Sequence, residues 1–251
     1  MVHFVGAGSG AADLITVRGA RLIKNADVLI YAGSLVNPEL LNYAKSGCAI
    51  YNSAQMTLEE VTDVIKRAEH EGKTTVRLHT GDSSIYGAVR EQFDALNALG
   101  IPYDVCPGVS SFCGAAAALR AEYTLPDVSQ TVIISRAAGN TPVPEKESIV
   151  SLAAHKATMI LFLSMGVIET LQCDLIDGGY EESTPAAIVY KATWPDEKIM
   201  RCTVGTLACT AADNGIKKTA LVIVGDFLGE KYDRSKLYDP SFSTEFRSAV
   251  K

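Results

Sequence analysis

The chain has 251 residues, of which 47% are hydrophobic and 21% charged, an ordinary composition for a globular protein of one large or two medium domains. Its formal net charge of −6 disfavours nucleic-acid binding, because phosphate recognition needs a basic surface. The opening MVHFVGAG predicts a strand and a glycine turn rather than a signal peptide, and the most apolar stretch, 157–168, is too short to span a bilayer. We therefore expect a cytoplasmic protein without nucleic-acid or membrane partners.

The cysteines and histidines suggest no metal site. None of the six cysteines forms a C-x-x-C pair, and several lie in apolar runs such as Val105-Cys106, which favours buried free thiols in a reducing compartment. The four histidines are scattered along the chain, so we predict no metal ligands.

The first half alternates strands with helices, which predicts a mainly parallel sheet covered on both faces. The clearest helix runs over 57–71, where Thr57 and Glu60 form a capping box and Gly72 ends the helix. A second helix is expected from near Ser84 to Gly100. Short runs rich in Val, Ile and Tyr predict strands at 2–5, 28–31, 49–51, 74–78 and 103–106.

The second half begins after a small-residue helix at 111–120, which places the domain boundary at about residue 120. We expect an N-terminal α/β domain over 1–120 and a C-terminal α/β domain over 121–251, with a polar tail that frays from about 229. The runs 186–191 and 199–203 are close enough to form a hairpin, which favours a mixed sheet. The other predicted strands of this half are 131–135, 158–163 and 220–224.

A glycine loop, Gly6-Ala7-Gly8-Ser9-Gly10-Ala11, follows the first strand. It fits the dinucleotide pattern G-x-G-x-x-G/A, which needs a tight turn and backbone N–H groups close to the ligand. An NAD enzyme should also carry an acidic residue at the end of the second strand, but Val28-Leu29-Ile30 runs into Tyr31-Ala32-Gly33. A dinucleotide enzyme is therefore disfavoured, and a purely structural turn is a further alternative.

Three other segments make the pattern specific. They are the stretches Arg77-Leu78-His79-Thr80-Gly81-Asp82-Ser83-Ser84-Ile85-Tyr86-Gly87, Pro107-Gly108-Val109-Ser110-Ser111-Phe112 and Tyr190-Lys191-Ala192-Thr193-Trp194-Pro195-Asp196-Glu197. Together with the glycine loop, they resemble the tetrapyrrole methylase family of the class III methyltransferases, in consistent order from residue 2 to about 228. The segments Tyr31–Val36 and Ser135–Pro142 resemble its precorrin-4 C11-methyltransferase branch.

The resemblance implies two α/β domains with an active-site cleft between them, S-adenosylmethionine in that cleft, and a homodimer. It implies methyl transfer to C11 of precorrin-4 or cobalt-precorrin-4 in cobalamin biosynthesis. Carried over by position, the cofactor contacts are Ser9, Gly81, Asp82, Ile85, Ser110, Ser111, Met165 and Ala192. Met165 is also compatible with a plain core position.

Two positions depart from the family pattern. Ser9 replaces the proline of the usual G-x-G-P-G, and Ser83 replaces the proline of the usual G-D-P. Losing a proline frees φ and loosens a loop, by roughly 0.5–1 kcal/mol through the unfolded chain. Neither change removes a charged or reactive group, so the implied activity stands.

Methyl transfer from a sulfonium to carbon is an in-line displacement with a neutral leaving group, so alignment of the reactants matters more than acid catalysis. A base for the proton finally lost from the macrocycle is not identified among Asp82, Tyr86, Asp104 and Glu122. Asp82 better suits an anchoring role. We expect His79 to be a hydrogen-bonded strand-end residue rather than a catalytic one.

The acetate and propionate arms of a tetrapyrrole would be held by local basic groups. Arg136 is the first candidate, followed by Lys191 and Arg18, although each also fits an exposed, solvated charge. Tyr86 is a candidate for packing on the macrocycle or within its own helix. Two functional alternatives stay open: methylation of another tetrapyrrole, such as uroporphyrinogen III or a different precorrin, and a non-catalytic cofactor-binding module.

Overall fold

The computed structural model describes residues 1–250, so Lys251 at the end of the expected tail lies outside it. The chain divides into two compact units. The first comprises Met1–Ala115 and Ala192–Asp196, and the second Ala116–Lys191 and Glu197–Lys251. The expected boundary at residue 120 falls just after helix α4 (Ser111–Leu119), and the excursion of 192–196 into the first unit was not foreseen.

The first unit contains a five-stranded sheet in the order β3-β2-β4-β1-β5. All four pairings are parallel, as expected from the alternation of strands and helices. The carboxyl ends of β4, β1 and β5 consequently lie side by side, where open α/β sheets bind ligands. The strands are β1 (Val2–Gly6), β2 (Val28–Tyr31), β3 (Ala49–Asn52), β4 (Thr75–His79) and β5 (Tyr103–Cys106).

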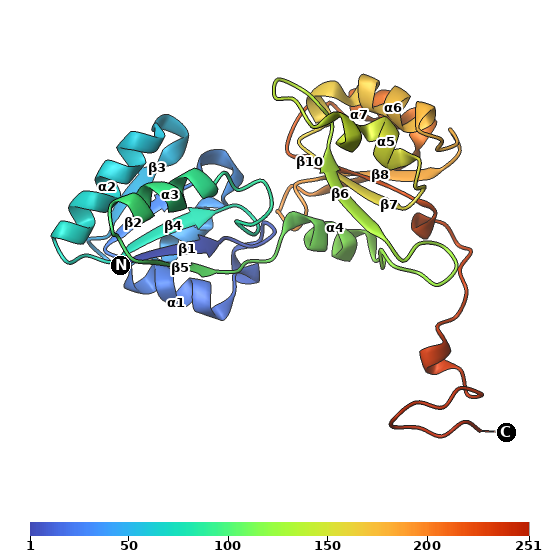
Figure 1. Cartoon of the computed structure of the whole chain (residues 1–251), viewed down its shortest axis with the longest axis horizontal. Coiled ribbons are helices and arrows are strands. Elements are labelled where there is room, and N and C mark those ends of the chain that lie inside the picture. Colours follow the sequence, from blue (N-terminus) through green and yellow to red (C-terminus); the bar gives the residue numbers. More distant parts are fainter. Residues whose placement is uncertain (251) are drawn as a thin grey trace. The chain divides into compact units, whose positions relative to one another are not determined.

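Helices cover both faces of this sheet (Figure 1). Alternation along β1 sends Val5 into a core with Ile23 of α1, while Phe4 packs on the opposite face with Val64 of α2 and Leu96 of α3. The helices are α1 (Val17–Asn25), α2 (Leu58–His70) and α3 (Arg90–Ala98), with short 3-10 turns at Ala12–Leu14, Gly33–Leu35, Pro38–Tyr43 and Ser53–Gln55.

The helix boundaries test the capping arguments. Thr57 and Glu60 form the predicted capping box at the start of α2. The expected helix start near Ser84 is wrong, because α3 begins only at Arg90. Tyr86 and Ala88 adopt positive φ values of 53° and 47°, which a right-handed helix cannot contain.

The second unit contains a mixed sheet in the order β6-β7-β10-β8-β9. Only β6 and β7 are parallel, and β8 and β9 form the predicted antiparallel hairpin. The strands are β6 (Val132–Arg136), β7 (Thr158–Phe162), β8 (Pro185–Tyr190), β9 (Lys198–Thr203) and β10 (Ala220–Val224).

One face of this sheet forms a core with three helices, in which Leu161 and Ile188 meet Leu171 and Leu207. The Arg201 guanidinium of β9 donates to the Leu119 carbonyl at the end of α4, over 2.9 Å. The helices are α5 (Ile149–Ala153), α6 (Ile168–Asp177) and α7 (Leu207–Asp213), with 3-10 turns at Glu145–Glu147, Met165–Val167, Val204–Thr206, Asp226–Leu228 and Lys236–Tyr238.

The tail and the cysteines differ in part from expectation. Beyond Gly229 the tail holds one short 3-10 turn and is tied by Arg247, whose Nη2 donates to the carbonyls of Leu237, Asp239 and Phe242. All six cysteines are free, but only Cys106 is buried, because most of the others lie on outward helix or loop positions. No helix in residues 1–250 has the length and apolar character that crossing a membrane would require.

Candidate functional site at the strand ends of the first unit

Three glycines bring the ends of β1, β4 and β5 into backbone contact. A Cβ added to Gly108 would lie 2.2 Å from the Gly81 carbonyl oxygen, and one added to Gly6 would lie 2.6 Å from the Gly108 nitrogen. Gly8 and Gly81 exchange two backbone hydrogen bonds of 3.2 and 3.1 Å. Only glycine allows such close approach, so the three loops form one continuous backbone surface.

Asp82 ties this surface together. Its Oδ1 accepts from the Ser84 backbone N–H over 2.9 Å and from the Ser84 hydroxyl, while its Oδ2 accepts from the Gly108 N–H over 2.7 Å. Burial opposes ionisation of Asp82, but the hydrogen bonds from Ser84 and Gly108 outweigh it and lower the pKa of the carboxyl. A carboxylate with both oxygens engaged and a lowered pKa is an anchor and a poor general base.

The loop after Asp82 carries the predicted contacts Ile85 and Tyr86. Ile85 is half-buried, and its N–H donates to the Asp82 carbonyl over 3.3 Å. Tyr86 is 45% exposed and left-handed, so packing within a helix is excluded for it. Its expected contact with a macrocycle stays a prediction.

The start of α4 closes the site from the β5 side. Ser110 is buried and its carbonyl accepts from the Cys113 N–H over 3.0 Å, while Ser111 is half-buried. A Cβ added to Gly114 would lie 2.7 Å from the Ser9 Cβ, so this helix rests directly on the glycine loop. The structure thereby gathers Ser9, Gly81, Asp82, Ser110 and Ser111, and their role as cofactor contacts stays a prediction.

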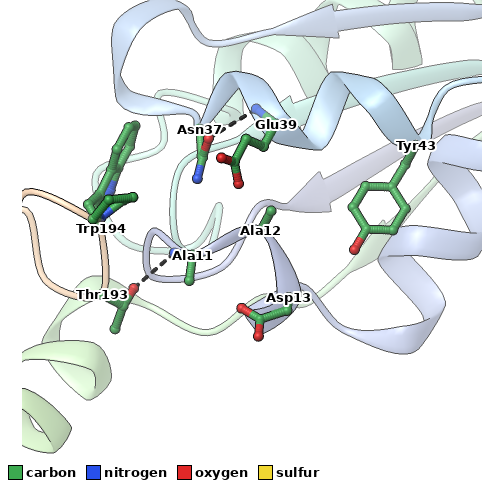
Figure 2. A pocket seen from close by; sticks show the side chains of 9 residues that line it. Ala11, Ala12, Asp13, Asn37, Glu39, Tyr43, Thr193 and Trp194 are labelled. Carbon is green, nitrogen blue, oxygen red and sulfur yellow. Dashed lines mark hydrogen bonds between the residues drawn. The ribbon is translucent and has the colours of Figure 1, made fainter.

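Residues 192–196 lie against the glycine loop. The Thr193 hydroxyl is 3.1 Å from the Ser9 hydroxyl. It accepts from the Ala11 N–H over 3.0 Å (Figure 2). A Cβ on Gly10 would fall 2.3 Å from Cδ1 of Trp194 and 2.5 Å from the Ala192 carbonyl oxygen. Ala192, a predicted cofactor contact, is thus adjacent to the loop that carries Ser9.

A pocket of about 340 Å³ opens beside this junction (Figure 2). The buried Asn37 amide holds its wall, donating from Nδ2 to the Gly10 carbonyl over 3.0 Å while Oδ1 caps the Glu39 N–H. The pocket combines the carboxylates of Asp13 and Glu39 with aromatic surface. Its lining residues are Ala11, Ala12, Asp13, Asn37, Glu39, Tyr43, Thr193, Trp194 and Pro195.

Beneath Gly81, strand β4 buries Arg77 and His79. The Arg77 Nε donates to Gln92 Oε1 over 3.0 Å, and desolvation lowers the pKa of the guanidinium to about 10. Burial, reinforced by the charge of Arg77, lowers the pKa of His79 to about 3. His79 Nε2 has no hydrogen-bond partner within residues 1–250, where the ring stacks against Phe4, and the expected hydrogen bond of this histidine stays a prediction.

Several predicted residues lie elsewhere. Met165 is buried in the core of the second unit. Arg136 and Lys191 also belong to that unit. Arg136 donates to the carbonyls of Ala137, Thr141 and Pro142, so its guanidinium holds its own loop. The Lys191 Nζ lies 5.4 Å from the Tyr190 ring centroid, and Arg18 is exposed on α1. Their roles in substrate binding stay predictions.

The two remaining candidates for a general base also have partners. The Asp104 carboxylate pairs with His3 over 2.6 Å, and Glu122 accepts from the Thr124 hydroxyl over 3.5 Å. The sequence argument missed Asn37 and did not single out Thr193. The Asn37-Pro38 pair signals a turn, and Asn37 caps the Pro38–Tyr43 turn. No local pattern marks Thr193, since its partners lie more than 180 residues away.

Comparisons with known proteins agree with this geometry. The family model of Tetrapyrrole (Corrin/Porphyrin) Methylases matches residues 1–208. A cobalt-precorrin-4 C(11)-methyltransferase from Methanocaldococcus jannaschii is 54% identical, covering 100% of this chain and 97% of the relative. A precorrin-4 C(11)-methyltransferase from Mycobacterium tuberculosis is 43% identical, covering 94% and 95%.

A solved structure extends the agreement to three dimensions. The X-ray structure of a cobalt precorrin-4 methyltransferase, a cobalamin biosynthetic enzyme, is 46% identical with a TM-score of 0.89, covering 91% of this chain and 96% of that chain. The predicted fold class is confirmed by this match and by the two sheets described above. By sequence and by fold, the chain belongs to the tetrapyrrole (corrin/porphyrin) methylase family.

Proposed function

We propose that this chain transfers a methyl group from S-adenosylmethionine to C11 of cobalt-precorrin-4 in cobalamin biosynthesis. The observation that carries the proposal is the 54% identity to a cobalt-precorrin-4 C(11)-methyltransferase over the whole chain. The chain is a methyltransferase of the precorrin-4 C11 type. The choice of the cobalt-containing acceptor rests on the higher identity to that relative than to the metal-free type.

The strand-end surface supports S-adenosylmethionine as the donor. The loops at 6–11, 80–87 and 107–112 contain glycines, serines and only one charged side chain, Asp82. These loops contain no lysine or arginine, so they hold no positive side chain that would repel the sulfonium. A ligand without phosphates also needs no lysine to bind it. The close-packed backbone at Gly6, Gly81 and Gly108 holds the three loops next to one another, which supports a preformed ligand site.

S-adenosylmethionine, when bound, supplies an electrophilic methyl group whose bonding electron pair stays with sulfur. The protein's part is alignment, and a preformed site can carry much of the rate in such a displacement. Asp82 fixes the distance between two loops by accepting from Ser84 and Gly108, and the buried Ser9 and Ser110 lie on the same surface. We keep the eight predicted cofactor contacts as part of this proposal.

We further propose that the protein acts in the cytoplasm. We also propose a homodimer, which follows from the family resemblance and is tested by sedimentation of the purified chain. The substrate contacts Tyr86, Arg136, Lys191 and Arg18 belong to the same proposal. Of these, Arg136 already donates from Nη1 and Nη2 to carbonyls of its own loop, so a substrate carboxylate would be bound by its remaining N–H groups.

A turnover assay tests the function. Labelled S-adenosylmethionine is supplied with cobalt-precorrin-4 and, separately, with precorrin-4, and the product is analysed for label at C11. We expect transfer to the cobalt form; transfer to the metal-free form alone would overturn the choice of acceptor. No transfer to either, with the donor still bound, would reject the C11 assignment and direct the search to uroporphyrinogen III or to a non-catalytic role.

A further inference from the structure

We propose that Thr193 is a positioning residue for the methyl-donor site, because its hydroxyl fixes the shape of the glycine loop through Ser9 and Ala11. The expected effect on the affinity for the methyl donor rests on the proposed function. Its structural basis is contained within the first unit, to which 192–196 belongs.

The backbone of this segment is strained. Thr193 has φ of 66° and Lys191 has φ of 46°, both in the left-handed region. A β-branched residue seldom adopts this conformation, which persists only where surrounding contacts enforce it. Such strain at a strand-end loop indicates that the position of the Thr193 side chain matters more than local backbone preference.

The Thr193 hydroxyl is the contact that uses this conformation. It bridges the Ser9 hydroxyl, at 3.1 Å, and the Ala11 N–H, at 3.0 Å, on two successive turns of the glycine loop. Other contacts also hold the loop, among them the Gly8–Gly81 backbone pair and the Asn37 amide on the Gly10 carbonyl. Thr193 adds a contact from a distant part of the chain, and it reaches Ser9 by a side-chain hydrogen bond.

Ser9 gives this contact its significance. This chain has serine at position 9, where the tetrapyrrole methylase family usually has proline. The loop therefore lacks the proline ring that would restrict φ. Ser9 is 6% exposed, and its hydroxyl pairs with Thr193 across the loop. A tertiary hydrogen bond therefore supplies here the restraint that a covalent ring supplies elsewhere, and its loss should loosen Ser9, a proposed donor contact.

Four variants of the full chain test the inference. Thr193→Val keeps the β-branched shape and removes the hydroxyl, and Thr193→Ser keeps the hydroxyl. Ser9→Ala removes one of the two partners, and the double variant combines it with Thr193→Val. Thr62→Val on α2 is the matched control, since it also deletes a part-buried threonine hydroxyl that makes one 2.8 Å hydrogen bond, to the Leu58 carbonyl.

The readouts are the Kd for S-adenosylhomocysteine, the KM for S-adenosylmethionine and kcat, and amide hydrogen exchange of residues 6–12 without ligand. We expect Thr193→Val to raise Kd and KM roughly tenfold, with kcat at saturation within a factor of about three, through loss of two hydrogen bonds. Exchange at 6–12 should accelerate. Thr193→Ser and Thr62→Val should stay within about twofold of the parent, and the double variant should be no weaker than Thr193→Val.

Each contrary result has a definite meaning. Unchanged exchange at 6–12 in Thr193→Val overturns the inference, as does unchanged Kd in a parent that binds S-adenosylhomocysteine. Full additivity of Ser9→Ala and Thr193→Val would show that their hydroxyls act independently and would also overturn it. If the parent binds no S-adenosylhomocysteine while exchange responds as expected, the proposed donor is wrong and the coupling of Thr193 to the loop stands.

Discussion

The carboxylate of Asp82, just beyond β4, accepts a 2.7 Å hydrogen bond from the backbone N–H of Gly108, just beyond β5. These two strands flank β1, so the bond spans the end of the strand that leads into the glycine loop. The contact joins two of the three loops of the candidate site through one side chain. It gives the acidic residue of the candidate site a task that requires no proton transfer.

Replacing Asp82 by asparagine should therefore weaken the site. The amide can accept at one position only, so the Gly108 N–H or the Ser84 backbone N–H loses its partner, at a cost of about 1–2 kcal/mol in the free energy of unfolding. Urea unfolding measures this cost, and Asp94→Asn on α3 is the control, because Asp94 makes only an exposed pair with Arg90. Equal effects of the two substitutions would contradict the anchoring role.

The same anchor predicts a pH dependence. The folded pKa of Asp82 lies below its ordinary value of 3.8, so its stabilisation is fully present above that value. The stabilisation is lost as pH falls through the folded pKa. The stability difference between the parent and Asp82→Asn should accordingly be constant from pH 7 to 5 and shrink below about pH 4, as followed by urea midpoints at each pH.

The glycine contacts predict a large steric effect. Gly108→Ala would place a Cβ 2.2 Å from the Gly81 carbonyl oxygen, which forces two strand ends apart and should cost about 3 kcal/mol or more. Gly139→Ala is the matched control, since its Cβ would meet no atom within 4 Å. Thermal unfolding should separate the two variants clearly. A Gly108→Ala protein as stable as the control would show that the strand ends are not in contact.

Much of the fold follows from local sequence. The runs 28–31, 103–106 and 220–224 match β2, β5 and β10 residue for residue, because short β-branched stretches bounded by polar or glycine residues have few alternatives. The structure of the segment 84–89 was not predicted, since nothing in Ser84-Ile85-Tyr86 signals a tyrosine in the left-handed conformation. The left-handed Tyr86 and Ala88 prevent a helix there, while the Asp82 side chain accepts from the Ser84 N–H at the start of the segment.

The candidate site was predictable in part for the same reason. Glycine loops at strand ends can be read locally, and Ser9, Gly81 and Ser110 indeed converge. The contributions of Thr193 and Asn37 depend on contacts at sequence separations of 184 and 27 residues. Arg136 shows a contact that the sequence could not reveal, because its guanidinium donates to carbonyls of its own loop, and its substrate role stays a prediction.

The buried Arg77 predicts a compensation between two substitutions. Gln92→Leu removes the acceptor of a desolvated guanidinium and should cost about 2–3 kcal/mol in unfolding free energy. Replacing both residues, as Arg77→Met with Gln92→Leu, removes the charge as well and should recover part of that loss. A double-mutant cycle by urea unfolding measures the recovery. A double variant less stable than either single one would show that Arg77 is stabilised by its other acceptors, the carbonyls of Ile30 and Leu78.

His79 should make the protein sensitive to mild acid. Its folded pKa of about 3 lies below the ordinary value of 6.5, so folding favours the neutral ring. The stability linked to this residue is complete above pH 6.5 and falls as pH drops toward 3, by up to about 1.4 kcal/mol per pH unit. His79→Leu keeps an apolar side chain against Phe4 and removes this titration, so its stability should decline less steeply than that of the parent between pH 6.5 and 4. His155→Leu is the control for the loss of an imidazole, because His155 is exposed. Parallel curves of stability against pH for the parent and His79→Leu would mean that the buried ring accepts a proton without opposing the fold.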